Sequence, residues 1–136
     1  MRMLFFAHSG LRYLVLVAGI LALVYLAYSV LTRRGNERTG RILGAAFAGL
    51  LDLQILLGIL MVVLGLYYSA LLGHLFMMVA AAAVAHGAMA LARSSPDVAR
   101  ANSIRLLGVL ISFALIIGGI LAIGRSVFGS GAPSIG

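Results

Sequence analysis

The sequence predicts an all-α protein, a bundle of four antiparallel transmembrane helices that forms a single domain. Of its 136 residues, 63% are hydrophobic and only 10% are charged, and the mean hydropathy is +1.17. The apolar residues form long runs whose lengths approach the roughly 20 residues that a helix needs to cross a bilayer. The charged residues lie between these runs. Composition and patterning therefore predict a membrane protein.

The runs predict helices and not barrel strands, because they lack the alternation of apolar and polar residues that a membrane strand shows. Backbone groups in lipid must also be paired within the spanning segment, as they are in a helix. We expect the helices at residues 10–31, 42–67, 71–92 and 105–127, and a flexible tail at residues 129–136.

The first helix follows a start, "MRMLFF", that resembles a signal peptide. The apolar segment after it is too long for the apolar part of a signal peptide, and no A-x-A cleavage site ends it. We therefore expect an uncleaved first helix.

The orientation of the helices follows from the basic residues in the short links, because arginine-rich links stay in the cytoplasm. All ten basic residues are arginine, and the net charge is +7. Seven lie in the first and third links: Arg33, Arg34, Arg38 and Arg41, then Arg93, Arg100 and Arg105. We expect both termini on the outer side of a bacterial cytoplasmic (inner) membrane. The charge thus reports topology, and we expect no nucleic-acid partner.

The later helices carry small residues at helical spacing, in "GAAFAG", "AAAAVAHGA" and "GG", which favours close helix packing. The chain has no cysteine, which excludes disulfides, thiolate metal sites and iron–sulfur clusters. Histidine and methionine are the remaining good ligands for a soft or borderline metal.

Polar side chains inside the spans form two predicted layers. At about 1.5 Å of rise per residue, His8, Arg12 and His74 lie roughly 37, 31 and 28 Å from the inner boundary. Gln54 lies at about 20 Å, and Asp52 and His86 at about 16 and 10 Å. We expect an outer layer of His8, Arg12, His74 and Gln54 and an inner layer of Asp52 and His86.

The outer layer predicts a heme b site. Two histidines from different helices of an antiparallel bundle can face one another across a gap, as the two axial ligands of a heme must. Arg12 lies one turn below His8 on the same face, where its guanidinium can hold a propionate. Gln54 with Gly58 on the second helix, and Met78 on the third, would line the macrocycle.

Each of these residues also has a structural interpretation. His8 and Arg12 can sit at the lipid interface, and His74 can cap the start of its helix. In the inner layer, Asp52 and His86 are interpreted first as a neutralised structural bridge and second as a proton relay. His86 is the alternative heme ligand, but it lies about 120° around the helix from His74, so one heme is favoured over two.

Three segments, "HSGLRYLVL", "LQILLGI" and "GHLFMMVAAAAVAH", resemble a family of small bacterial four-helix membrane proteins labelled cytochrome b-like. The likeness covers the first three helices and matches at His8, Arg12, Gln54 and His74. The chain differs from the family pattern at Asp52, where relatives often have histidine, and at His86, which many relatives lack. The resemblance implies the four-helix fold and supports the outer cluster of His8, Arg12, Gln54 and His74.

The sequence therefore favours a heme b protein that transfers single electrons, linked to quinone or to other membrane-complex subunits, and not a stand-alone enzyme. The main alternative is a cofactor-free accessory subunit of a respiratory or photosynthetic complex in the bilayer. A weaker alternative is a transporter or copper-handling protein that uses histidine and methionine.

Overall fold

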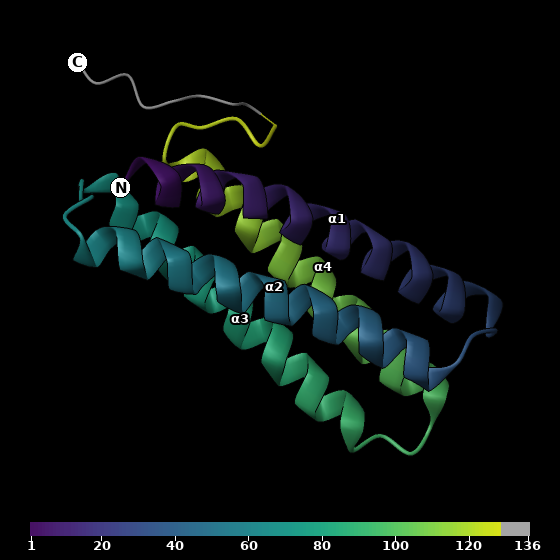
Figure 1. The fold of residues 1–136 in the computed structure, drawn as a ribbon. Coiled ribbons are helices and arrows are strands. Elements are labelled where there is room, and N and C mark those ends of the chain that lie inside the picture. Colours follow the sequence, from purple (N-terminus) through teal and green to yellow (C-terminus); the bar gives the residue numbers. More distant parts are fainter. Residues whose placement is uncertain (129–136) are drawn as a thin grey trace.

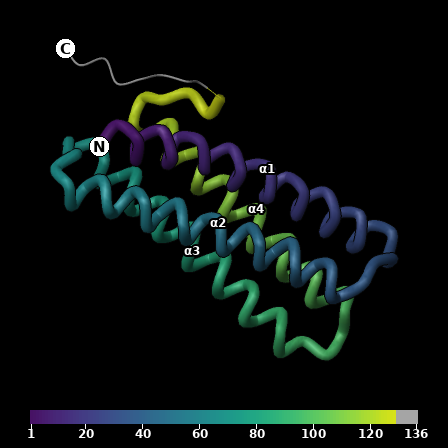
Figure 2. Tube along the Cα trace, viewed as in Figure 1, coloured from purple at the N-terminus to yellow at the C-terminus, as the bar shows by residue number. Residues whose placement is uncertain are grey.

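The computed structural model describes residues 1–128, which form four helices joined by short links. The helices are α1 (Arg2–Thr32), α2 (Glu37–Val63), α3 (Ala70–Arg93) and α4 (Val98–Ala122). They run alternately in opposite directions, so that α1 begins at the end of the bundle where α4 finishes (Figure 1; Figure 2 shows the same path as a Cα trace). The predicted all-α four-helix bundle is confirmed.

The helices differ in their bounds from the apolar runs of the sequence. α1 begins at Arg2 without a side-chain cap, whereas capping residues start α2 and α4 before their apolar runs. Asn36 Oδ1 accepts a hydrogen bond from the Thr39 N–H at 2.7 Å, which starts α2 inside the arginine-rich link. The Asp97 carboxylate accepts from the N–H groups of Ala99 and Arg100, both at 3.3 Å, and starts α4 in the same way. The predicted tail, residues 129–136, lies outside the described residues.

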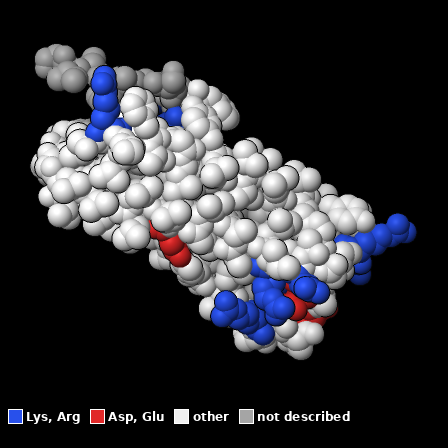
Figure 3. Space-filling view, in the orientation of Figure 1, with Lys and Arg blue, Asp and Glu red and all other residues white. Residues whose placement is uncertain are grey.

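All four helices are long and apolar enough to cross a membrane. Large apolar side chains face outward along them, among them Leu14, Leu21 and Val24 on α1 and Phe76 and Val79 on α3. Figure 3 shows the basic side chains gathered toward the two ends of the bundle, with a nearly uncharged surface between them. This distribution is that of a multi-pass membrane protein.

The helices pack unequally around the bundle. α3 packs most extensively on α4, where a Cβ atom at Gly108 would overlap the Cβ of Ala88. α1 packs mainly on α2, and Gly44 of α2 leaves room for the Met89 sulfur of α3. Within residues 1–128, no Cα atom of α1 lies within 8 Å of one of α3. These two helices are therefore diagonal neighbours, and the space between them is filled by side chains.

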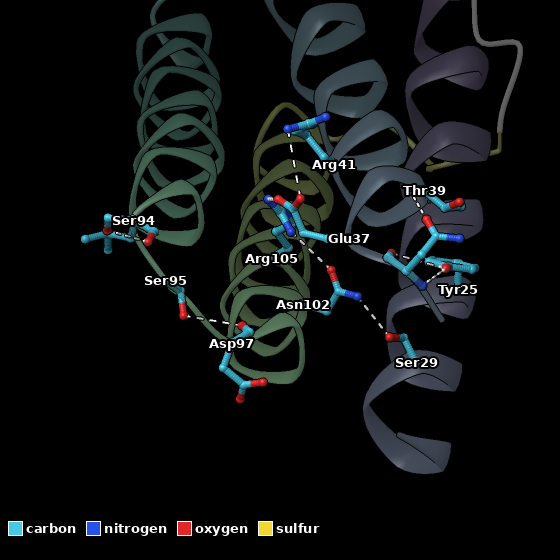
Figure 4. Close-up of polar contacts among 12 residues, drawn as sticks. Tyr25, Ser29, Glu37, Thr39, Arg41, Ser94, Ser95, Asp97, Asn102 and Arg105 are labelled. Atoms are coloured by element: carbon cyan, nitrogen blue, oxygen red, sulfur yellow. Dashed lines mark hydrogen bonds and ion pairs between the residues drawn. The ribbon is translucent and has the colours of Figure 1, made fainter. Parts of the chain in front are cut away.

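A buried polar cluster ties three helices together at the end of the bundle that carries the α1–α2 and α3–α4 links (Figure 4). Arg105 is fully buried, and its Nη2 donates to Glu37 Oε1 at 2.9 Å while its Nη1 donates to Asn102 Oδ1 at 3.2 Å. Asn102 Nδ2 in turn donates to Ser29 Oγ at 2.9 Å. The cluster thus joins α1, α2 and α4 through side chains alone.

The position of Arg105 corrects the sequence analysis, which assigned this residue to a link as a marker of topology. The structure places it inside α4, where it points into the bundle. Hydropathy counts an arginine as a boundary residue, but here Glu37 and Asn102 supply the partners that allow a buried guanidinium.

We expect Arg105→Met to lower the free energy of unfolding by about 1–3 kcal/mol, because it leaves the fully buried Asn102 carbonyl oxygen without a donor. Arg100→Met is the matched control, since Arg100 is exposed on the same helix. The measurement is denaturant unfolding in detergent micelles followed by circular dichroism. Equal stability of the two variants would show that the cluster contributes nothing.

Candidate functional site

A cavity of about 120 Å³ lies in the half of the bundle where α1 begins and α4 ends. All four helices contribute to its wall, together with Arg125 from the segment that follows α4. Its volume is far above the roughly 10–15 Å³ that a single water molecule requires. The wall is mostly apolar, and its polar members are His8, Ser9, Arg12, Gln54, Tyr68, His74 and Arg125.

His8 on α1 is held against α2 by Gln54. The Gln54 Nε2 donates to the backbone oxygen of His8 at 3.0 Å and lies 3.3 Å from the imidazole Nε2. Gly58 lies one turn beyond Gln54, and a Cβ atom there would come within 3.2 Å of the His8 ring. The absence of a side chain at Gly58 therefore makes room for the imidazole.

Two buried polar atoms of this pair, His8 Nδ1 and Gln54 Oε1, have no hydrogen-bond partner among the described residues. A buried donor or acceptor without a partner costs roughly 1–3 kcal/mol of stability. Both atoms belong to residues that line the cavity. Unmatched polar atoms at a cavity indicate a ligand or ordered water that would satisfy them.

His74 on α3 is oriented by α4. Its Nδ1 donates to the backbone oxygen of Gly119 at 2.9 Å. With the proton on Nδ1, the Nε2 of a neutral imidazole carries a lone pair. This is the arrangement in which ligating histidines are held, with one ring nitrogen on a backbone carbonyl and the other available to a metal.

Arg12 and Arg125 add positive charge to the cavity wall. The Arg12 side chain is buried, donates from Nη2 to the Tyr13 hydroxyl at 3.2 Å and lies over the Tyr13 ring. The Arg125 guanidinium carbon lies 5.0 Å from the centre of the Phe5 ring. No Asp or Glu among residues 1–128 lines this cavity. The wall therefore suits a ligand that carries carboxylates.

The structure brings together on this one cavity the six residues that the sequence analysis assigned to the heme site. Met78 is 5% exposed and packs in the core as well as lining the cavity. The six residues are His8, Arg12, Gln54, Gly58, His74 and Met78.

Asp52 and His86, the predicted inner layer, lie outside this cavity. The His86 Nε2 is 2.9 and 2.8 Å from the two carboxylate oxygens of Asp52. Both side chains are about half exposed, at 49% for Asp52 and 56% for His86. The alternative heme ligand, His86, is therefore engaged by a carboxylate on the outer surface of the bundle.

Sequence reasoning did not find two parts of the site. Arg125 was not assigned to the site, although its place at the end of the last predicted span puts it at the same end of the bundle as His8. Gly119 was interpreted as a packing residue, and its role as the acceptor for His74 has no sequence signal, because a backbone oxygen is present at every position.

Among the described residues, the wall offers a metal two histidine side chains, together with the methionine sulfurs of Met61 and Met78. In the described part of the chain, no group of three or more His, Cys, Asp or Glu residues is placed to hold a metal ion. A pair of imidazoles suits a metal whose remaining ligands come from a cofactor, as in a six-coordinate heme.

The chain was compared with protein-family models, with curated proteins and with solved structures, and none of them matches it.

We expect Gly119→Ala to lower the free energy of unfolding by about 1–3 kcal/mol. The added Cβ would lie 2.6 Å from Met78 Cε and 3.0 Å from Met77 Cβ, so the Met78 side chain and α3 at Met77 must move away from α4. Gly118→Ala is the control, because its Cβ meets only the mobile end of Met77 at 3.1 Å. Thermal unfolding in detergent measures the stability of both variants. A larger loss of stability in Gly118→Ala than in Gly119→Ala would contradict this packing.

Proposed function

We propose that this protein binds one heme b in the cavity and transfers single electrons near the outer face of a bacterial cytoplasmic membrane. His8 and His74 are the proposed axial ligands, and Arg12 holds a propionate. Quinone or another subunit of a membrane complex is the proposed redox partner. The resemblance of the first three helices to the cytochrome b-like family points the same way.

The observation that carries the proposal is that two histidines from diagonal helices line the same cavity. α1 and α3 have no backbone contact within residues 1–128, so a group placed between their side chains breaks no backbone packing between these two helices. The enclosed 120 Å³ is smaller than the roughly 300–1,000 Å³ of typical ligand pockets, so binding requires the cavity to widen. The cavity is partly open, and it can widen on its open side.

The histidine and arginine side chains of the cavity fit a heme b. His74 has its Nδ1 proton on Gly119, which leaves Nε2 for iron. At His8, an iron at Nε2 would take the place of the Gln54 amide, and Gln54 would stay anchored by its bond to the His8 backbone oxygen. The positive charge of Arg12 and Arg125 suits the two propionates, to which arginine can make paired hydrogen bonds.

The chemistry that a heme with two histidine ligands supplies is reversible one-electron exchange. The protein supplies the environment in which this exchange is fast. Apolar residues from all four helices make up most of the wall, and the imidazoles are positioned by Gln54 and by the Gly119 carbonyl. A heme held by His8 and His74 would keep the same two ligands in the ferric and the ferrous state, which suits an electron carrier.

We expect the purified protein, saturated with hemin, to show a Soret band that shifts on reduction with dithionite and a sharp α band. His8→Ala and His74→Ala should each abolish this low-spin spectrum, because each removes an axial ligand. His86→Ala is the matched control and should keep it, since His86 lies outside the cavity.

A featureless visible spectrum from the intact, hemin-treated protein would remove the heme proposal and favour the accessory-subunit alternative. A low-spin spectrum that survives in both His8→Ala and His74→Ala would place the ligands elsewhere.

The proposed location of the site also requires both termini on the outer side. We expect a C-terminal alkaline phosphatase fusion to be active and a C-terminal green fluorescent protein fusion to be dark in bacterial cells, because arginines hold the first and third links inside. A fusion of each reporter after Arg34, in the first link, is the control and should give the opposite pattern. A fluorescent C-terminal fusion would contradict the orientation.

A further inference from the structure

The Asp52–His86 pair lies on the outer surface of α2 and α3, with Asp52 near the middle of α2 and His86 in the C-terminal half of α3. Its hydrogen bonds are short, at 2.8 and 2.9 Å, yet about half of each side chain is exposed. Figure 3 shows acidic atoms on the bundle surface about halfway along it, apart from the charges at the ends. The face around the pair is otherwise apolar.

Such a pair is costly where it faces hydrocarbon. Ionisable residues within membrane spans almost always face a protein interior or a water-filled cavity. The carboxylate can accept about four hydrogen bonds, but the described residues supply only His86 as a donor. His86 Nδ1 has no partner in the described part of the chain. The pair therefore has unused hydrogen-bonding capacity that lipid cannot meet and another protein surface can.

The surface beside the pair is shallow enough for another helix to approach. Ala45 and Gly49 lie beside Asp52 on the exposed face of α2, and Ala83 and Gly87 lie beside His86 on that of α3. A Cβ atom at Gly49 or Gly87 would meet nothing within 4 Å. Small residues four apart on a membrane helix permit close helix–helix contact.

We propose that this α2–α3 face binds a second copy of the same chain, in a two-fold dimer in which each Asp52 meets the other copy's His86. Two copies with the same topology are related by an axis along the membrane normal, so each residue keeps its depth. Rotation by 180° about that axis places α2 of one copy opposite α3 of the other. The carboxylate of each copy then faces the imidazole of its partner.

This symmetry is the reason that the occupant is a second copy. Asp52 and His86 lie side by side at one depth, as their 2.8 Å contact requires. The α2–α3 face therefore presents an acid and a base at one depth, and a second copy presents the same two groups at that depth. A different membrane protein would need an independently matched acid and base there. The inference does not depend on heme binding.

The test is Förster transfer between donor- and acceptor-labelled copies in lipid vesicles, over a range of protein-to-lipid ratios. Because the chain has no cysteine, Arg34→Cys in the exposed first link provides a single labelling site. We expect the labelled protein to self-associate. We expect Asp52→Leu/His86→Leu to raise the dissociation constant roughly tenfold or more, since two cross-copy contacts are lost.

Gly49→Leu tests the same face by steric exclusion and leaves the polar pair in place. It should weaken association to a similar degree, because its side chain meets nothing within one copy. Gly10→Leu is the control, since Gly10 is equally open but lies on α1, and it should associate as the labelled parent does.

Absence of transfer in the parent at every protein density would overturn the dimer. Equal association of all variants would also overturn it, because the contact would then lie on another face. Circular dichroism of each variant checks that the helices are intact, and Gly49→Leu decides the question if the double variant does not fold.

Discussion

The arrangement of this bundle depends on one constraint, which is that a polar group surrounded by hydrocarbon must find a partner within protein. The polar side chains inside the spans meet this constraint in different ways. Arg105 is fully buried and bonded to Glu37 and Asn102, while Ser112 donates to the backbone oxygen of Ala81 at 2.8 Å and joins α4 to α3. These bonds lie inside one chain and join neighbouring helices, although the buried Nε of Arg105 has no hydrogen-bond partner among the described residues.

The hydrogen bonding is also incomplete at the cavity and at the outer pair. At the cavity, His8 Nδ1 and Gln54 Oε1 are buried without partners. On the surface, Asp52 and His86 satisfy one another but remain half exposed. The same constraint thus bears on both proposals, since unmatched atoms at a cavity indicate a ligand or ordered water there, and a half-exposed pair on the surface indicates a second chain.

Packing explains why the cavity lies where it does. Small residues bring α3 close to α4, as at Gly108 against Ala88, and Gly19 on α1 accommodates the Phe113 ring of α4. α1 and α3 are left on the diagonal, joined by side chains such as those of the core residues Leu16 and Met78. Toward the end of the bundle that holds the start of α1, these side chains do not fill the diagonal, and the two histidines face the remaining space.

The sequence by itself determined the class of the protein, the four spans, and the membership of His8, Arg12, Gln54 and His74 in one layer. These properties depend on local composition and on the constant rise of a helix, which can be counted along the chain. Only the tertiary structure decided that Arg105 points inward, that Arg125 joins the cavity, and that the Asp52–His86 pair faces outward. Helices that are apolar on every side have no polar face to show which way they turn, so the direction of each side chain is set by the neighbouring helices.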